Sequence, residues 1–171
     1  MWSKNYFLSW DDFKAESNPA AFEDAHSTIR YRHTWTLNSD EIENKIVFFI
    51  ENLHLSVEFH PMLSWYRPGE NNDNLLKHEQ GHFDLGEIIK NENLEKLQNK
   101  FYGKPFPTRG KNEEQRKQFA KEDSGKMISK EVKTLDYILS QRRKQYDDDT
   151  CFGQNIDSQL KYDLLFDKLR T

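Results

Sequence analysis

The chain has little cysteine, glycine or proline, and each shortage excludes a class of protein. Cys151 is the single cysteine among 171 residues, so no intramolecular disulfide can form and no oxidising compartment is implied. With 7 glycines and 5 prolines, the chain is neither collagen-like nor of low complexity. No apolar run approaches the roughly 18 residues that a membrane-spanning helix needs, so we expect no insertion into a membrane.

The chain also lacks a strong excess of charge of one sign. Its 25 basic and 29 acidic side chains give a formal net charge of -4, which argues against nucleic acid as the main ligand. Aromatic residues reach 13%, a content that disordered chains rarely have. The length predicts one domain over residues 1–171 that folds without a metal. Residues 1–6 contain no continuous apolar core of an export signal, which predicts a cytoplasmic protein; the sequence indicates no oligomeric state.

The first half of the chain has the alternation of β-strands. Residues 27–37 alternate between apolar or aromatic and polar side chains and predict a half-buried strand. Asn38, Ser39 and Asp40 are turn formers and predict a turn after it. Residues 46–59 predict either one long strand or two strands that turn near Glu51 and Asn52.

The second half has the spacing of helices. Residues 75–100 lack proline and follow a run of helix-capping residues, which predicts a long helix. A capping pair, Asn112 and Gln115, predicts a second helix that ends near residue 145, and residues 156–169 predict a third. Strands followed by helices are typical of the α+β class.

One motif in the first predicted helix carries chemistry. His78 and His82 are four residues apart, so their imidazoles project from one face of a helix, one turn from each other. Two such nitrogens can bind a Zn²⁺ ion, and Glu79 then lies beside the metal as a general base; this is the HExxH pattern of zinc peptidases. The alternative is a pair of surface histidines, but both lie on the apolar stripe of Leu75 and Ile89 and should face inward.

The segment His78-Glu79-Gln80-Gly81-His82-Phe83-Asp84 resembles a bacterial family of predicted zinc-dependent proteases that is catalogued as a domain of unknown function. The likeness extends over about residues 8–170 and includes residues 8–13, 64–65 and 145–147, Thr150 and Gly153. It implies a zincin-like fold and zinc-dependent peptide hydrolysis, and members of the family are often exported. The chain departs from the family pattern at Phe152, where the family has a histidine.

A zinc hydrolase usually has a third protein ligand, and the turn after His82 offers only Gly86. Asp147 is the first choice, because the segment around it matches the family, although an acidic loop at 147–149 could simply be solvated. Glu131 is the second choice, since it borders the apolar stripe of its helix. The remaining choices are another histidine or an acidic residue of the second helix: Glu122, Asp123 and Asp136.

Other side chains have predicted supporting roles. Tyr146 is expected to donate a hydrogen bond to the oxyanion, and otherwise to be a packed aromatic. Asp84 and Glu87 flank the motif and are expected to bind the free nitrogen of a histidine ligand or a neighbouring side chain; the alternative for Asp84 is a surface or capping role.

These observations together predict a zincin-like α+β fold, with a small antiparallel sheet followed by an active-site helix and two further helices. The expected function is zinc-dependent hydrolysis of a peptide or protein substrate, in which Glu79 takes a proton from a metal-activated water. The substrate is expected to pair with the sheet edge at residues 46–59. The alternative, favoured by Phe152, is a non-catalytic metal-binding or protein-interaction domain on the same fold.

Overall fold

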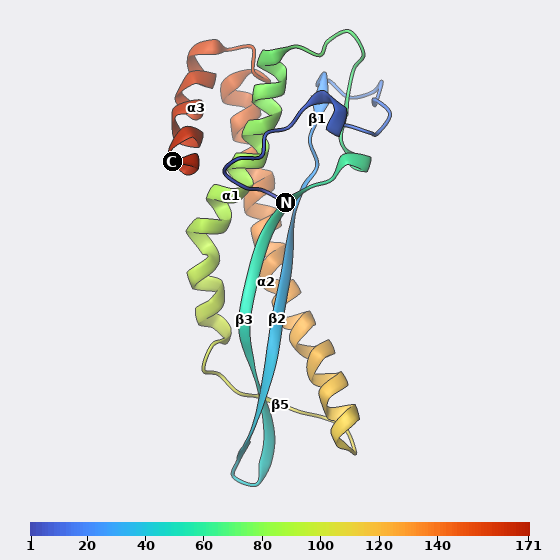
Figure 1. Cartoon of the computed structure of the whole chain (residues 1–171), viewed down its shortest axis with the longest axis vertical. Coiled ribbons are helices and arrows are strands. Elements are labelled where there is room, and N and C mark those ends of the chain that lie inside the picture. Colours follow the sequence, from blue (N-terminus) through green and yellow to red (C-terminus); the bar gives the residue numbers. More distant parts are fainter.

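A long antiparallel hairpin forms the centre of the α+β fold in this computed structural model, which describes residues 1–171 (Figure 1). Strands β2 (Ile29–Ile42) and β3 (Lys45–Phe59) make the hairpin, and β5 (Phe106–Pro107) pairs with Val47 and Phe48 of β3. A second, two-stranded sheet joins β1 (Ala25–His26) to β4 (Trp65–Tyr66). There are also two short 3-10 helices: η1 (Trp10–Asp12) precedes β1, and η2 (Pro61–Leu63) lies between β3 and β4 in sequence.

The turn predicted at residues 38–40 is wrong. Strand β2 continues through these polar residues to Ile42, because the tip of the hairpin is exposed and does not require alternation. The chain reverses instead at Glu43 and Asn44, whose φ angles are 51° and 60°. A two-residue turn with positive φ at both positions matches the twist of a hairpin, and asparagine tolerates that conformation well.

Residues 46–59 lie in one strand, so the sequence alternative of two strands is excluded. The pairing nevertheless shifts near the suspected position: Thr34 pairs with His54, whereas Thr36 pairs with Glu51. Asn52 has a φ of 49° there, and its side-chain Nδ2 donates to Thr36 Oγ1 at 2.9 Å. This irregularity is a β-bulge, which bends a strand without ending it.

The three predicted helices are confirmed. Helices α1 (Asp73–Phe101), α2 (Glu113–Thr150) and α3 (Ile156–Arg170) each begin after an asparagine whose side chain accepts a hydrogen bond from the third residue beyond it. Helix α2 continues about one turn past the predicted end near residue 145, so residues 146–150 are helical. None of these helices has the length and apolar character needed to cross a membrane.

Helix α1 packs along β3, helix α2 packs along β2 and against α1, and α3 covers the upper part of α1 in Figure 1. Residues 78–87 of α1 are all buried, as expected for a helical segment enclosed on every side. Gly86 allows the close contact with the sheet, because a Cβ atom there would lie 2.8 Å from Val57 Cγ1. The buried residues form one core cluster of 22 hydrophobic side chains.

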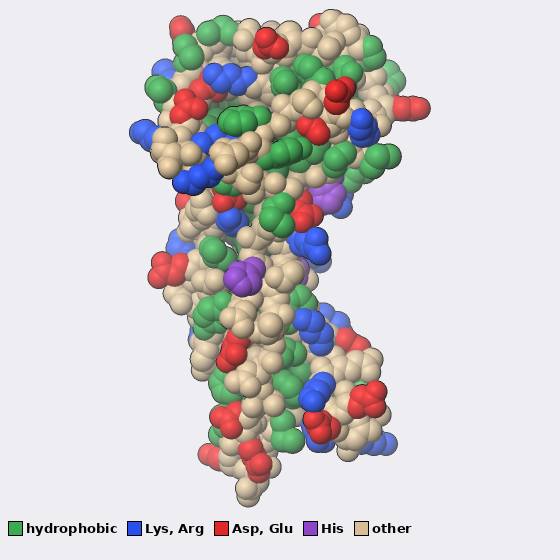
Figure 2. Space-filling model, viewed as in Figure 1, with side chains coloured by type: hydrophobic (Ala, Val, Ile, Leu, Met, Phe, Trp, Pro, Cys, Tyr) green, Lys and Arg blue, Asp and Glu red, His purple; other side chains and the backbone are tan.

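The space-filling view shows a broad upper end and a narrow lower end (Figure 2). Hydrophobic side chains gather at the upper end, around the N-terminal segment and α3. At the lower end the hairpin tip and the start of α2 form two separate projections, which carry charges of both signs (Figures 1 and 2). The enclosed part of α1 therefore belongs to the broad end.

Candidate metal centre

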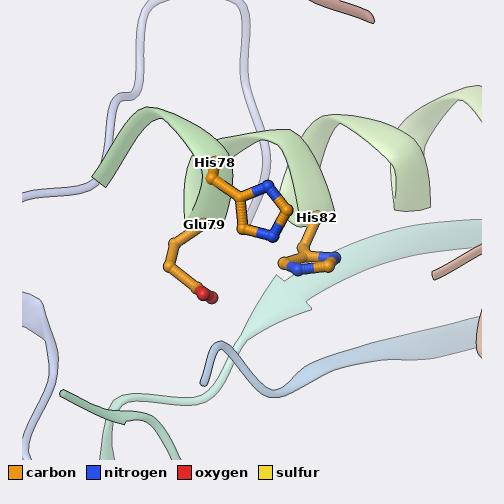
Figure 3. A group of neighbouring side chains, drawn as sticks. All are labelled: His78, Glu79 and His82. Carbon is orange, nitrogen blue, oxygen red and sulfur yellow. The ribbon is translucent and has the colours of Figure 1, made fainter. Parts of the chain in front are cut away.

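His78 and His82 project from the same side of α1 toward the strands, as their spacing predicts, and the Glu79 carboxylate extends beside them (Figure 3). The two imidazole rings are 4.8 Å apart between centroids. One ligand atom from each of His78, Glu79 and His82 lies within 4.8 Å of the others, and all three residues are buried. Such a group of nitrogen and carboxylate donors is compatible with a bound metal ion.

Asp147 meets both histidines. Its Oδ1 lies 3.1 Å from His78 Nε2 and 3.0 Å from His82 Nε2. Because α2 continues to Thr150, Asp147 is presented from a helix rather than from the acidic loop considered in the sequence. Ligands about 2.0–2.1 Å from a tetrahedral zinc are about 3.3 Å from one another, and both Asp147 distances are close to that spacing.

The hydrogen bonds around His78 determine which of its ring nitrogens carries a proton. Its Nδ1 faces Gln159 Oε1 at 3.1 Å and Thr150 Oγ1 at 3.3 Å. The Gln159 amide is oriented by its Nε2, which donates to Tyr146 Oη and Asp163, and Thr150 donates its hydroxyl proton to a backbone carbonyl. Both neighbours of Nδ1 therefore accept, and Nδ1 is the donor.

This tautomer leaves the Nε2 lone pair of a neutral His78 directed at the Asp147 carboxylate, 3.1 Å away. A lone pair facing an anionic oxygen is repulsive unless a cation lies between them, as a proton or a metal. The donor set therefore fits a divalent metal bound by His78, His82 and Asp147. Gln159 and Thr150 then hold the ligating imidazole from behind, which is the usual arrangement around histidine ligands.

Two buried polar atoms next to this group have no hydrogen-bond partner: Glu79 Oε2 and His82 Nδ1. An unpaired buried polar atom costs about 1–3 kcal/mol, and such atoms are rare in folded proteins. Glu79 is held in place through its backbone, whose carbonyl accepts from Ser27 Oγ at 3.4 Å. Its free carboxylate oxygen is available to a ligand that enters the site.

The electrostatics of the site favour the metal-binding forms of His82 and Asp147. Burial holds the pKa of His82 well below its usual value, and the positive charge of Arg143 lowers it further. Burial would raise the pKa of Asp147, but its contacts with both histidines and the charge of Arg143 outweigh this and lower its pKa below the ordinary value. A neutral imidazole and an ionised carboxylate are the states that bind zinc.

Tyr146 is fully buried and stacks on the His78 ring, with 4.5 Å between centroids. Its hydroxyl donates to the His78 backbone carbonyl at 3.2 Å and accepts from Gln159 at 2.7 Å, and burial raises its pKa. The hydroxyl proton that was expected to stabilise an oxyanion is therefore used in a hydrogen bond to the backbone of α1. Tyr146 is therefore a packed aromatic, which was the alternative expected from the sequence. Its ring positions the His78 imidazole.

The other predicted third ligands lie elsewhere. Glu131 pairs with Lys100, which is 18 residues beyond His82 on α1, or about 27 Å along a helix. Glu122 and Asp123 pair with Arg109. Asp136 lines a cleft beside His82 but makes no contact with the histidines.

Asp84 and Glu87 bind neighbouring side chains and not the nitrogen of a histidine. Asp84 binds Arg170, Trp2 and Gln80, and Glu87 binds Lys90, whereas Gln159 contacts His78 Nδ1. No signal in the sequence identifies Gln159, because it is 81 residues from His78. The edge of β3 expected to bind substrate is occupied by β5, by Tyr102 and Gln98 at Leu53, and by the backbone of Trp2 at Val57.

Phe152, which replaces the family's histidine, packs against Phe22 with 5.7 Å between ring centroids. The Phe152 backbone is left-handed, with a φ of 55°. The next residue in the chain, Gly153, lies against the side chain of His78. Comparison of the chain with models of known protein families, with curated proteins and with solved structures gives no match. The resemblance to the predicted proteases therefore stays a prediction.

Proposed function

We propose that the protein is a zinc-dependent peptidase with a zincin-like fold. The observation that carries the proposal is the convergence of His78 Nε2 and His82 Nε2 on Asp147 Oδ1, with an unpaired Glu79 oxygen beside them. His78, His82 and Asp147 would hold the metal, which leaves a fourth position open, as in hydrolytic zinc sites. A zinc ion bound there supplies a Lewis acid and lowers the pKa of water toward about 7.

The residues of the chain supply the remaining steps. Glu79 Oε2 accepts a proton from the attacking water and returns it to the leaving amine, so the carboxylate is regenerated after each cycle. Gln159 and Thr150 keep the His78 proton on Nδ1, and Tyr146 holds the backbone of α1 at His78. Burial excludes bulk water from these contacts and strengthens them.

A second function is favoured by the burial of the site. His78 and Glu79 are only 1% and 2% exposed, and the neighbouring cleft reaches His82 alone among the three motif residues. A domain that binds a metal in this place without cleaving a substrate has the same ligands and no need for a wide opening. Zinc content and peptidase activity, measured on the same preparation, distinguish the two functions.

The test compares the wild-type chain with Glu79→Gln and with Glu131→Gln as a matched control far from the site. We expect one zinc per chain in all three proteins and cleavage of a mixed peptide library by wild type and control. Loss of the general base should reduce cleavage by about 10²–10⁴-fold in Glu79→Gln. Zinc binding without any cleavage by the wild type would support the non-catalytic function, and equal activity in the Glu79 variant would disprove the mechanism.

A further inference from the structure

A cleft of about 480 Å³ lies between β2 and α2 and ends at His82. Arg30 from β2 and Arg143 from α2 contribute the positive charges of its lining, and Asp136 contributes the only negative one. Ser140 adds a hydroxyl at the exposed side of α2. The cleft therefore connects the surface to His82, and basic groups outnumber acidic ones among its lining residues.

Arg143 is held in place but keeps hydrogen-bonding capacity. One terminal nitrogen donates to the Ser27 carbonyl, the other lies 3.3 Å from His26 Nδ1, and Nε is 3.9 Å from Asp147 Oδ2. A guanidinium has five N–H groups, so at least two remain for a ligand in the cleft. A fixed guanidinium with free donors is suited to a planar carboxylate, which it can bind through two parallel hydrogen bonds.

Arg30 supplies a second charge at the outer part of the cleft. It is exposed on β2 and its charge acts on Asp136, although the two side chains do not form a direct ion pair. The neighbouring Arg32 lies outside the cleft and pairs with Glu58 at 3.5 Å. The lining carries two guanidinium groups and one carboxylate, and although Arg143 also lies near Asp147, its remaining N–H groups favour an anionic group in the cleft.

We propose that this cleft binds a carboxylate of the peptide substrate and thereby places a nearby peptide bond at the metal. The inference rests on the proposed function, since it names the substrate class of the same site. The carboxylate can be the C-terminal group of the peptide or the side chain of an acidic residue. Arg143 is the inner contact and Arg30 the outer one.

Binding can be measured separately from catalysis in the full chain with Glu79→Gln, which leaves the peptide intact. Three probes are titrated into the zinc-loaded and the zinc-free protein: acetylated trialanine, its C-terminal amide, and an acetylated tripeptide amide with a central glutamate. The backbone amide signals of Arg30 and Ser140 in nuclear magnetic resonance spectra report on the cleft directly. Arg30→Gln and Arg143→Gln are compared with Arg32→Gln and Arg142→Gln, whose native side chains pair with Glu58 and Glu92.

We expect at least one carboxylate probe to bind about tenfold more tightly than the neutral amide, as for a charged hydrogen-bonded pair. Preference for trialanine indicates a C-terminal carboxylate, and preference for the glutamate peptide indicates an acidic side chain. Arg143→Gln should weaken binding about tenfold and Arg30→Gln about two- to fivefold, while the two controls leave it unchanged. Because Arg30 is exposed, its variant keeps the test valid if Arg143→Gln fails to fold.

Equal binding of the amide and both carboxylates would overturn the inference. Carboxylate binding that is insensitive to both cleft variants would overturn it too, since the group would then bind the metal alone. Failure of the proposed function gives a different result: the protein takes up no zinc, or cleaves nothing, while the zinc-free chain still prefers a carboxylate and this preference is reduced in Arg30→Gln.

Discussion

Gly81 is the residue whose replacement tests the packing behind His78 and His82 most severely. A Cβ atom at this position would lie 2.2 Å from Tyr146 Oη, 2.8 Å from Tyr146 Cζ and 2.9 Å from Phe166 Cε2. Real Cβ contacts of this length do not occur, so one partner must move. Tyr146 cannot easily retreat, because it stacks on His78 and its hydroxyl binds both α1 and Gln159.

The expected change in the free energy of unfolding for Gly81→Ala has three contributions. Overpacking of a well-filled core costs about 1–3 kcal/mol, and loss of the Tyr146 hydrogen bond adds about 1 kcal/mol. Alanine offsets about 1 kcal/mol, because it favours a helix interior over glycine by that amount. We therefore expect Gly81→Ala to lower the free energy of unfolding by about 1–3 kcal/mol, and to weaken zinc binding because His78 shifts with Tyr146.

Urea unfolding of the metal-free protein measures the first effect, and a competition titration with a zinc chelator measures the second. Gly125→Ala is the matched control, since a Cβ atom there would lie 3.2 Å from the half-buried Trp35 ring, which can adjust. In a double-mutant cycle, Tyr146→Phe should recover part of the loss in Gly81→Ala, with a coupling of about 1 kcal/mol. A Gly81→Ala protein as stable as the Gly125→Ala control would refute the packing described here.

Three further predictions concern the ligands and their support. Asp147→Asn should weaken zinc binding at least about 100-fold in a chelator competition, whereas Asp148→Asn at the exposed neighbouring position should not; equal losses would mean that Asp147 is no ligand. Gln159→Leu removes the nearer of the two acceptors of the His78 Nδ1 proton and should weaken zinc binding about 10–100-fold, measured in the same way. The pKa of His82 is lower in the folded protein than in the unfolded chain, so the unfolded chain is the first to bind a proton at this residue as the pH falls. The stability that neutral His82 contributes above about pH 6.5 is therefore lost as the pH falls below that value. Urea unfolding of the metal-free protein between pH 7 and pH 5 should therefore show stability falling by up to about 1.4 kcal/mol per pH unit, and by less in His82→Asn.

Much of the fold could be predicted from local patterns. The three helices follow from capping asparagines and helical spacing, and the inward position of His78 and His82 follows from the apolar stripe. The hairpin turn could not be placed, because residues 38–44 are all exposed and all but Ile42 are polar, so burial imposes no pattern on them. The turn is determined by backbone twist at Glu43 and Asn44 instead.

Residue spacing alone predicted the site only where its residues are close in sequence, and Asp147 was expected only because its segment resembles the family. His78, Glu79 and His82 lie within one helical turn, whereas Asp147 comes from another helix and its contact depends on how far α2 extends. Gln159 reaches the site through the tertiary packing of α3, and Arg143 reaches it because it lies one turn before Asp147 on α2. The requirement for glycine at position 81 could not be predicted either. The side chain that leaves no room for a Cβ atom there belongs to Tyr146, which is 65 positions away.

The most direct test of the central claim is zinc-edge X-ray absorption spectroscopy on the purified protein, together with the zinc content per chain. A metal held by His78, His82 and Asp147 predicts one zinc per chain, two imidazole nitrogens at about 2.0–2.1 Å, and oxygen ligands from the carboxylate and from water. In Asp147→Asn the spectrum should lose the carboxylate contribution or the zinc itself. Absence of zinc from the wild type, or an unchanged spectrum in the variant, would contradict the account.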